Sequence, residues 1–171
     1  SLHDALPIFS AADLPHDIWD DVTWLHLTGY SFFDDGVRPL VLDLIADAKR
    51  RNVGVSIDPS SLGFLEAVGR EIALTWLADA DLVFPNDDEQ RFLQLADGRV
   101  VLTRGPEGAT FRDHEARAVP ANVVDTTGAG DAFCAGFLTV WIPTQDVESA
   151  LLSGTQSAAV CVAARGARPT D

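Results

Sequence analysis

Glycine and aspartate residues with the spacing of an anion-binding turn lie at residues 125–131, which read D-T-T-G-A-G-D. Gly128 and Gly130 permit a tight turn and a close approach of the backbone to a ligand. An apolar helical pattern begins there, and the first N–H groups of a helix have no partner within it. The pattern predicts an anion hole and leaves two roles open for Asp131: stabilising the helix dipole, or chemistry on the bound group.

Two further polar loops follow predicted strands. Residues 85–89 read P-N-D-D-E, and residues 103–108 read T-R-G-P-E-G. Ligands in open α/β sheets bind beyond the carboxyl ends of the strands, so both loops are candidate binding segments. Taken alone, Asn86 with Glu89 also fits a simple helix start, and the glycine-rich loop also fits a hairpin turn.

The elements that must position these loops alternate along the chain. Short β-rich runs occupy residues 22–30, 53–57, 81–84 and 100–103, and helical periods occupy residues 37–52, 64–78 and 87–95. This alternation predicts an α/β fold with a mostly parallel sheet and helices on both faces.

The last third of the chain departs from that alternation. Residues 109–112 and 116–119 predict an antiparallel hairpin. Two helices are then expected, from within residues 128–130 to residue 142 and over residues 146–164, with Gly166 as the C-cap of the second.

The longer string at residues 125–133, D-T-T-G-A-G-D-A-F, resembles the C-terminal signature of the ribokinase/PfkB kinases. The resemblance implies a ribokinase-like fold and ATP-dependent phosphorylation of a hydroxyl on a small molecule, with a sugar or sugar acid favoured and nucleosides or vitamin alcohols left open. It implies that Asp131 is the general base and that the backbone of Gly128, Ala129 and Gly130 is the anion hole. Phosphoryl transfer needs such positioning and charge stabilisation.

Weaker matches extend the resemblance over residues 22–168. Asn86 and Glu89 are similar to the family's N-x-x-E motif, which implies a role in holding Mg²⁺ and phosphate oxygens. The 103–108 loop resembles the family's T-x-G-x-x-G nucleotide loop, which implies that Thr103, Gly105 and Gly108 bind ATP.

Three more positions take roles from the resemblance alone. Residues 155–162 correspond to the helix that borders the adenine, and Thr155 stands where relatives often carry Asn, so adenine contact and helix packing are both open. Asp125 and Thr127 match positions that hold a monovalent cation such as K⁺ in many relatives.

The segment at residues 26–30, H-L-T-G-Y, resembles the family's strand-to-loop segment near the acceptor site. Gly29 is expected to serve the backbone geometry, and His26 to be a hydrogen-bonded strand histidine rather than a catalyst. After Asp58, Ser60 and Leu62 replace the Asn and Arg that many sugar kinases carry, which argues against members that use those side chains.

Composition excludes several classes of partner. The 171 residues contain 12 Lys and Arg against 26 Asp and Glu, for a net charge of −14, which argues against a nucleic-acid-binding surface. No apolar run approaches the ~20 residues that span a bilayer, so no membrane partner is expected and the chain reads as cytoplasmic. Cys134 and Cys161 are expected to be buried, reduced thiols.

The sequence contains no methionine and starts at Ser1, which predicts a fragment. We expect residues 1–8 to be a junction segment and residues 9–171 to be a partial ribokinase-like kinase domain that lacks the N-terminal strands and lid. A homodimer of the complete protein remains open.

Competing enzyme classes lack their motifs. Lys49 is the only lysine, which excludes the G-x-x-x-x-G-K-[ST] loop, and the sequence has no zinc-hydrolase or serine-hydrolase motif. The main alternative is a nucleotide-binding or structural fragment without catalysis, because the segment that would supply the acceptor contacts is absent.

Overall fold

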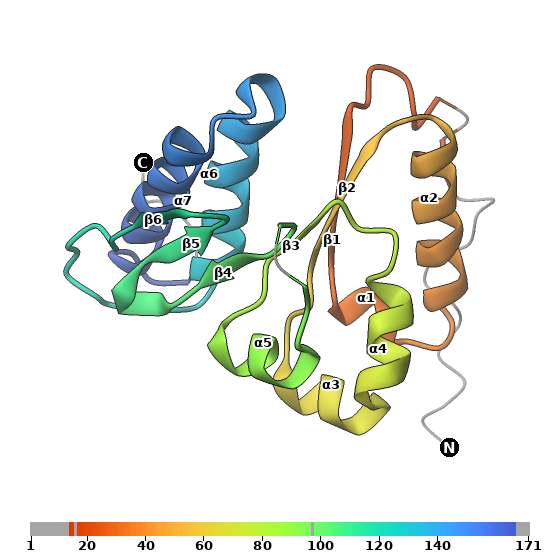
Figure 1. Cartoon of the computed structure of the whole chain (residues 1–171), viewed down its shortest axis with the longest axis horizontal. Helices are drawn as coiled ribbons and strands as arrows, with labels where there is room; N and C mark the ends of the chain where they lie inside the picture. Colours follow the sequence, from red (N-terminus) through yellow and green to blue (C-terminus); the bar gives the residue numbers. More distant parts are fainter. Residues whose placement is uncertain (1–13, 16, 97, 167–171) are drawn as a thin grey trace. The chain divides into compact units, whose positions relative to one another are not determined.

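The computed structural model describes residues 14–15, 17–96 and 98–166. The chain divides into two compact units, Ser1–Val83 and Phe84–Asp171. Helices and strands alternate in the first unit, and a strand-rich segment followed by two long helices forms the second (Figure 1). The expected junction at residues 1–8 lies outside the described residues.

The first unit is built on a parallel sheet. Strands β1 (Trp24–Thr28), β2 (Gly54–Asp58) and β3 (Leu82–Val83) lie in the order β1-β2-β3, with every pair parallel. Helix α2 (Arg38–Arg50) follows β1 and packs on β1 and β2, as a crossover between parallel strands requires. The predicted α/β fold with a parallel sheet is confirmed.

Strand β2 lies at the centre of this sheet and is buried there. Val55, Ser56 and Ile57 have no exposed surface, as expected for a strand covered on both faces. The hydroxyl of Ser56 accepts the indole N–H of Trp24 at 2.9 Å and lies 2.8 Å from Nδ1 of His26. His26 is therefore a hydrogen-bonded strand histidine, as predicted.

The turn after β1 requires glycine. The N–H of Gly29 donates to the Asp58 carbonyl at 2.6 Å, and a Cβ at this position would lie 2.2 Å from the Pro59 carbonyl oxygen. This close approach begins the short helix α1 (Tyr30–Phe33), which the sequence pattern did not predict. One turn of helix is too short to show a hydrophobic period.

The single helix predicted over residues 64–78 is wrong. The structure has two helices there, α3 (Leu62–Val68) and α4 (Arg70–Trp76). Gly69 separates them with φ 89° and ψ 146°, a conformation that helical backbone excludes and that glycine tolerates.

The second unit begins with helix α5 (Asp87–Leu93) and an antiparallel sheet. Strands β4 (Val101–Thr103), β5 (Ala109–Phe111) and β6 (His114–Ala116) pair in sequence order, with the 3-10 helix η2 (Gly105–Glu107) between the first two. The hairpin is confirmed, although its second strand lies before the predicted 116–119. Strand β4 joins this sheet rather than the parallel one, and Asn86 and Thr103 form an isolated parallel bridge in this unit.

Helices α6 (Ala129–Thr144) and α7 (Val147–Val162) complete the second unit. Helix α6 continues through Pro143, beyond the predicted end at residue 142, and α7 ends before the predicted residue 164, with Ala163 as its C-cap in place of the expected Gly166. Buried Phe133, Phe137 and Trp141 lie four residues apart on α6 and form one aromatic row.

The two long helices touch closely through glycine. A Cβ at Gly136 would lie 2.6 Å from the Ser153 carbonyl oxygen, and one at Gly154 would lie 2.7 Å from the Phe133 ring. The Ser153 hydroxyl also donates to the Gly136 carbonyl at 2.8 Å. Glycine therefore sets the spacing between α6 and α7.

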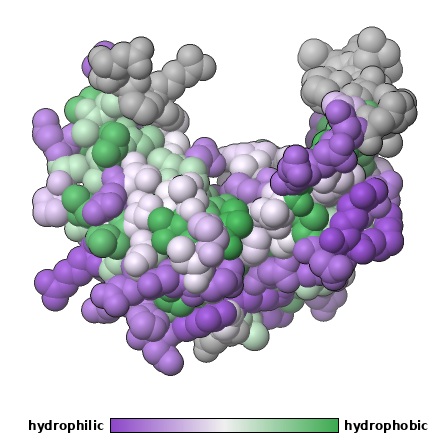
Figure 2. Space-filling view, turned by 90° about the horizontal axis from the view of Figure 1, so that it is seen from above, coloured by the Kyte–Doolittle hydropathy of each residue, from purple (hydrophilic) through white to green (hydrophobic). Residues whose placement is uncertain are grey.

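Apolar surface (green) lies in separate patches among hydrophilic side chains (purple) in Figure 2. Among the described residues, the large apolar side chains that remain exposed are Tyr30, Leu42, Phe64, Ile72, Val123, Val124, Leu152 and Val160. No helix within the described residues has the length and apolar character needed to cross a membrane.

Candidate functional site

The start of α6 leaves backbone donors open. Gly128 is its N-cap with φ 77° and ψ 4°, a left-handed conformation that favours glycine, and no side chain within the described residues caps the helix. Ala129 donates its N–H to the Thr126 carbonyl at 3.2 Å. The N–H groups of Gly130 and Asp131 follow in the first turn, where a helix has no carbonyl to accept them. This end of a 16-residue helix therefore suits an anion.

The loop before α6 is held by the end of α7. The Val162 carbonyl accepts the N–H groups of Val124 and Asp125 at 2.8 and 3.2 Å. The Cys161 thiol lies 3.5 Å from the Thr127 carbonyl oxygen, at the distance of a weak hydrogen bond. These contacts fix the geometry of the anion-binding turn through a helix that lies later in the chain.

The carboxylate of Asp125 also helps to hold the loop before α6 in place. Its Oδ1 accepts the Thr127 N–H at 2.9 Å, and its Oδ2 accepts the Gly166 N–H at 3.2 Å. Hydrogen bonds from the Thr127 backbone, the Thr127 hydroxyl and the Gly166 backbone lower the pKa of Asp125 below its usual range, because they stabilise the charged form. Asp125 therefore bonds to the backbone of Thr127, and the monovalent-cation role of this pair stays a prediction.

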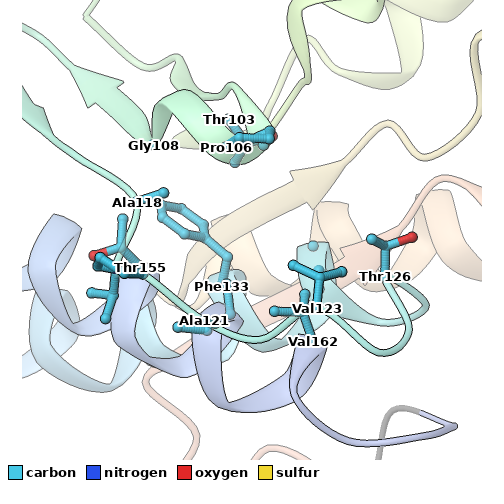
Figure 3. A pocket seen from close by; sticks show the side chains of 17 residues that line it. Thr103, Pro106, Gly108, Ala118, Ala121, Val123, Thr126, Phe133, Thr155 and Val162 are labelled. Carbon is cyan, nitrogen blue, oxygen red and sulfur yellow. The ribbon is translucent and has the colours of Figure 1, made fainter.

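A cavity of about 520 Å³ opens beside this turn, entirely within the second unit. Figure 3 shows Thr103 and Pro106 on one side of it, with Thr155, Phe133 and Val162 on the other. Six of the predicted site residues line the cavity: Thr103, Gly105, Gly108, Ala129, Gly130 and Thr155. Segments more than 50 positions apart along the chain therefore meet at one site, as the resemblance implied.

The lining of the cavity is predominantly apolar. Among the described residues that line it, none has a charged side chain, and the polar side chains are those of Thr103, Thr126 and Thr155. Gly130 both lines the cavity and lies in the first turn of α6. The arrangement fits a ligand that joins an apolar ring to an anionic group.

The 103–108 loop depends on its second glycine. Gly108 has φ 104°, and a Cβ there would lie 2.0 Å from the Ala116 carbonyl oxygen. The loop closes through a hydrogen bond from the Arg104 N–H to the Gly108 carbonyl at 2.8 Å. Gly105 has φ 51° with open space around it, so its backbone conformation, not crowding, favours glycine.

Asn86 and Glu89 form the N-terminal capping box of α5. Oδ1 of Asn86 accepts the N–H groups of Asp88 and Glu89, and Oε2 of Glu89 accepts the Asn86 N–H at 3.0 Å. The bridge to Thr103 places Asn86 beside the cavity, although neither member of the motif lines it, and Glu89 is buried. The part of the chain that the structure describes holds no group of three or more His, Cys, Asp and Glu side chains that could bind a metal ion.

Asp131 follows Gly130 directly and has an exposed side chain in the first turn of α6. Gly128 also lies outside the cavity lining and shapes the turn that leads into it. The structure therefore puts the predicted base in the first turn of α6, next in sequence to a residue that lines the cavity.

Sequence reasoning missed part of the cavity wall. Phe133 and the irregular segment at residues 118–121 line it, although neither carries a polar signal. On α7 the lining residues are Thr155, Ala158, Ala159 and Val162, spaced as one stripe of a helix. That spacing of small residues was visible in the sequence and is the one signal that could have identified individual wall positions.

Comparison with known proteins finds relatives that are named as ATP-dependent kinases. An ATP-dependent 6-phosphofructokinase from Thermoanaerobacterium thermosaccharolyticum is 28% identical over 151 residues, covering 76% of this chain and 47% of the relative. An ATP-dependent ribose-1-phosphate kinase from Halopiger xanaduensis is 33% identical over 135 residues, covering 71% of this chain and 44% of the relative. The chain thus spans about half the length of these relatives.

The fold is also that of a solved relative. The structure of a fructokinase from Vibrio cholerae, in its fructose, ADP and calcium ion bound form, superimposes with a TM-score of 0.75 at 23% identity, over 93% of this chain and 60% of that one. The family model described as pfkB family carbohydrate kinase matches residues 9–171. With the ribokinase-like fold and the D-T-T-G-A-G-D turn at the start of α6, this match shows that the chain belongs to the PfkB family of carbohydrate kinases.

Proposed function

We propose that this chain carries the nucleotide-binding and phosphoryl-transfer part of an ATP-dependent kinase that acts on a hydroxyl group of a small molecule, with a sugar or sugar acid as the favoured acceptor. The observation that carries the proposal is the meeting of an apolar cavity with the open N–H groups of α6 at Gly130. The relatives named above are kinases of sugars or sugar phosphates, which supports the same class of acceptor.

The cavity is proposed to hold the nucleotide base and ribose, with the phosphates toward the start of α6. Thr103, Gly105, Gly108 and Thr155 contribute to its walls. The N–H groups of Gly130 and its neighbours then offset charge on the transferring phosphoryl group. No lysine or arginine lines the described cavity, so the remaining phosphate charge calls for a metal ion.

Asp131 is proposed as the general base. Its carboxylate takes the proton of the acceptor hydroxyl while that oxygen forms a bond to the γ-phosphorus and the bond from phosphorus to the bridging oxygen of ADP breaks. An exposed carboxylate in the first turn of α6 can reach a group bound at the helix end without first breaking a buried contact.

Mg²⁺ would supply charge neutralisation on the phosphate oxygens when bound. The hydrogen-bonded oxygens of Asn86 and Glu89 are committed to the capping box, so we assign these residues to shaping the loop and to the water shell of the metal ion. Asp125 and Thr127 remain the candidate pair for a monovalent cation such as K⁺, since they meet in the turn before α6.

The experiment that tests the proposal is steady-state kinetics of Asp131→Asn in the complete protein with a panel of sugars and ATP. We expect kcat to fall by ~10²–10⁴ with little change in ATP affinity, because a general base acts in the transition state. Glu148→Gln is a matched control, since Glu148 is an exposed acidic residue in the first turn of α7. Near-normal turnover of Asp131→Asn would remove Asp131 from the base role.

The alternative function is nucleotide binding without catalysis. The specific observation in its favour is that the whole cavity lies in the unit Phe84–Asp171, which needs no acceptor site to bind a nucleotide. Nucleotide binding by this chain, together with no phosphorylation by the complete protein of any sugar, nucleoside or vitamin alcohol, would favour it.

A further inference from the structure

All the polar side chains among the described residues that line the cavity belong to threonine. The other described lining residues are glycine, proline, alanine, valine and phenylalanine. A site that selects one base through side-chain hydrogen bonds needs a side-chain atom that can only donate or only accept, such as those of an amide or a charged group. None of the described lining residues has such a side chain.

Threonine hydroxyls do not have a fixed role. A hydroxyl both donates and accepts, and it rotates to suit its partner. The Thr155 hydroxyl donates to the Leu152 carbonyl at 2.9 Å and the Thr103 hydroxyl to the Pro85 carbonyl at 3.4 Å. In this rotamer each hydroxyl can accept from a base, and after rotating away from its carbonyl each can donate to one. Thr126 adds a third hydroxyl at the α6 end of the cavity.

The backbone of residues 118–121 also contains both hydrogen-bond donors and acceptors. This stretch lines the cavity between β6 and α6 without regular secondary structure. It offers both N–H donors and carbonyl acceptors, apart from Pro120, which has no N–H. Adenine has an amino group where guanine and hypoxanthine have a carbonyl, and a segment that contains both kinds of backbone group is compatible with either.

From these observations, and resting on the proposed nucleotide site, we propose that the site recognises its base by shape and apolar contact and accepts purine nucleotides in general. Sites built around a fixed hydrogen bond reject an analogue by about 10⁴-fold or more, whereas apolar pockets discriminate by about 10²-fold or less. Adenine, guanine and hypoxanthine nucleotides are therefore expected to bind within about 10²-fold of one another.

The test is calorimetric titration of this chain with ADP, GDP and IDP, each with excess Mg²⁺. Dissociation constants within about 10²-fold of one another support the inference. An ADP affinity more than about 10²-fold above that of GDP or IDP overturns it and leaves the proposed function intact. Absence of binding by all three overturns both the inference and the nucleotide site on which it rests.

A pair of variants ties the binding to this cavity. Ala158→Trp fills the cavity from α7, whereas Val160→Trp adds the same bulk on the same helix at a residue that is 60% exposed and does not line the cavity. We expect Ala158→Trp to weaken the binding of all three nucleotides at least tenfold. Val160→Trp should leave the three affinities and their ratios unchanged. Unchanged affinity in a folded Ala158→Trp would place the binding elsewhere and overturn the inference. The comparison of the three nucleotides needs no variant, so it decides the matter even if Ala158→Trp does not fold.

Discussion

The carboxylate of Asp125 accepts the backbone N–H of Gly166 at 3.2 Å, across a sequence separation of 41 residues. The other oxygen of the same carboxylate accepts the Thr127 N–H at 2.9 Å. One side chain thereby joins the turn before α6 to the segment that follows α7. The anion-binding geometry at Gly128 and Gly130 depends on this connection as well as on the glycines themselves.

Asp125→Asn is expected to lower thermal stability at pH 7, because an amide cannot accept both N–H bonds as a carboxylate does. The folded-state pKa of Asp125 is depressed, so its contribution is full above the ordinary value of 3.8 and is lost as the pH falls through the lower folded value. The difference in melting temperature between the wild type and the variant should therefore narrow below pH 3.8. Circular dichroism melts at pH 7, 5 and 3 measure it.

The matched control is Asp79→Asn, which removes the same charge from an exposed position outside this turn. This variant reports the effect of net charge alone on the melting temperature. The stabilising role of the Asp125 carboxylate would be contradicted if the melting-temperature difference for Asp125→Asn stayed constant down to pH 3. It would also be contradicted if that difference equalled the one for Asp79→Asn.

The tight turn before α6 and the start of that helix could be predicted from the sequence because their causes are local. Gly128, Gly130 and the apolar run that follows determine a tight turn and a helix start without help from distant residues. The hairpin and the parallel strands were predictable for a similar reason, since period and turn residues act over short distances.

The features that could not be predicted depend on distant contacts or on a single residue. Gly69 breaks a helix whose hydrophobic period continues on both sides, and only its φ of 89° reveals the break. The bonds from Val162 and Gly166 to the turn before α6 join segments that have no shared pattern in the sequence. Phe133 belongs to the cavity wall because Gly154 lets α7 approach its ring, which no spacing rule foresees.

Gly130→Val is expected to weaken nucleotide binding and to lower turnover in the complete protein. Gly130 lines the cavity in the first turn of α6, and a β-branched side chain there would occupy space that the phosphates need. Calorimetry with Mg-ATP and steady-state kinetics measure the two effects. We expect each to change by tenfold or more.

Ala135→Val controls for the substitution itself. Ala135 is exposed on the same helix, so this variant places the same β-branched side chain on α6 away from the turn. Unchanged ATP binding and normal turnover in Gly130→Val would show that the start of α6 is not the anion site.

Removal of divalent cations is expected to weaken nucleotide binding by tenfold or more. No cationic side chain lines the described cavity, and the chain carries a net charge of −14, so an unneutralised triphosphate meets a repulsive field. Titration of ATP into this chain with Mg²⁺ or with excess EDTA measures the difference. Adenosine, which has no phosphate, is the control ligand and should bind equally in both conditions. Equal ATP affinity with and without the metal would show that the helix end alone neutralises the phosphates.

Strand β1 lies at an edge of the parallel sheet. It pairs with β2 on one side, and no strand pairs with its other side within the described residues. Unpaired N–H and C=O groups on a strand edge favour association with another chain. The same unit exposes apolar side chains at Tyr30, Phe64 and Ile72, which are 60%, 48% and 49% exposed. We therefore expect this chain to self-associate and to bind a hydrophobic dye.

Salt should strengthen that association. The net charge of −14 makes the chains repel one another, and added salt screens this repulsion while leaving apolar contacts in place. Light scattering over a range of protein concentrations at low and high salt should show a mass that rises with both. We also expect negligible kinase activity from this chain alone, because it spans about half the length of its kinase relatives. A compact monomer at every concentration and salt level, together with robust ATP-dependent phosphorylation of a sugar, would show instead that these residues contain a closed sheet and a complete acceptor site.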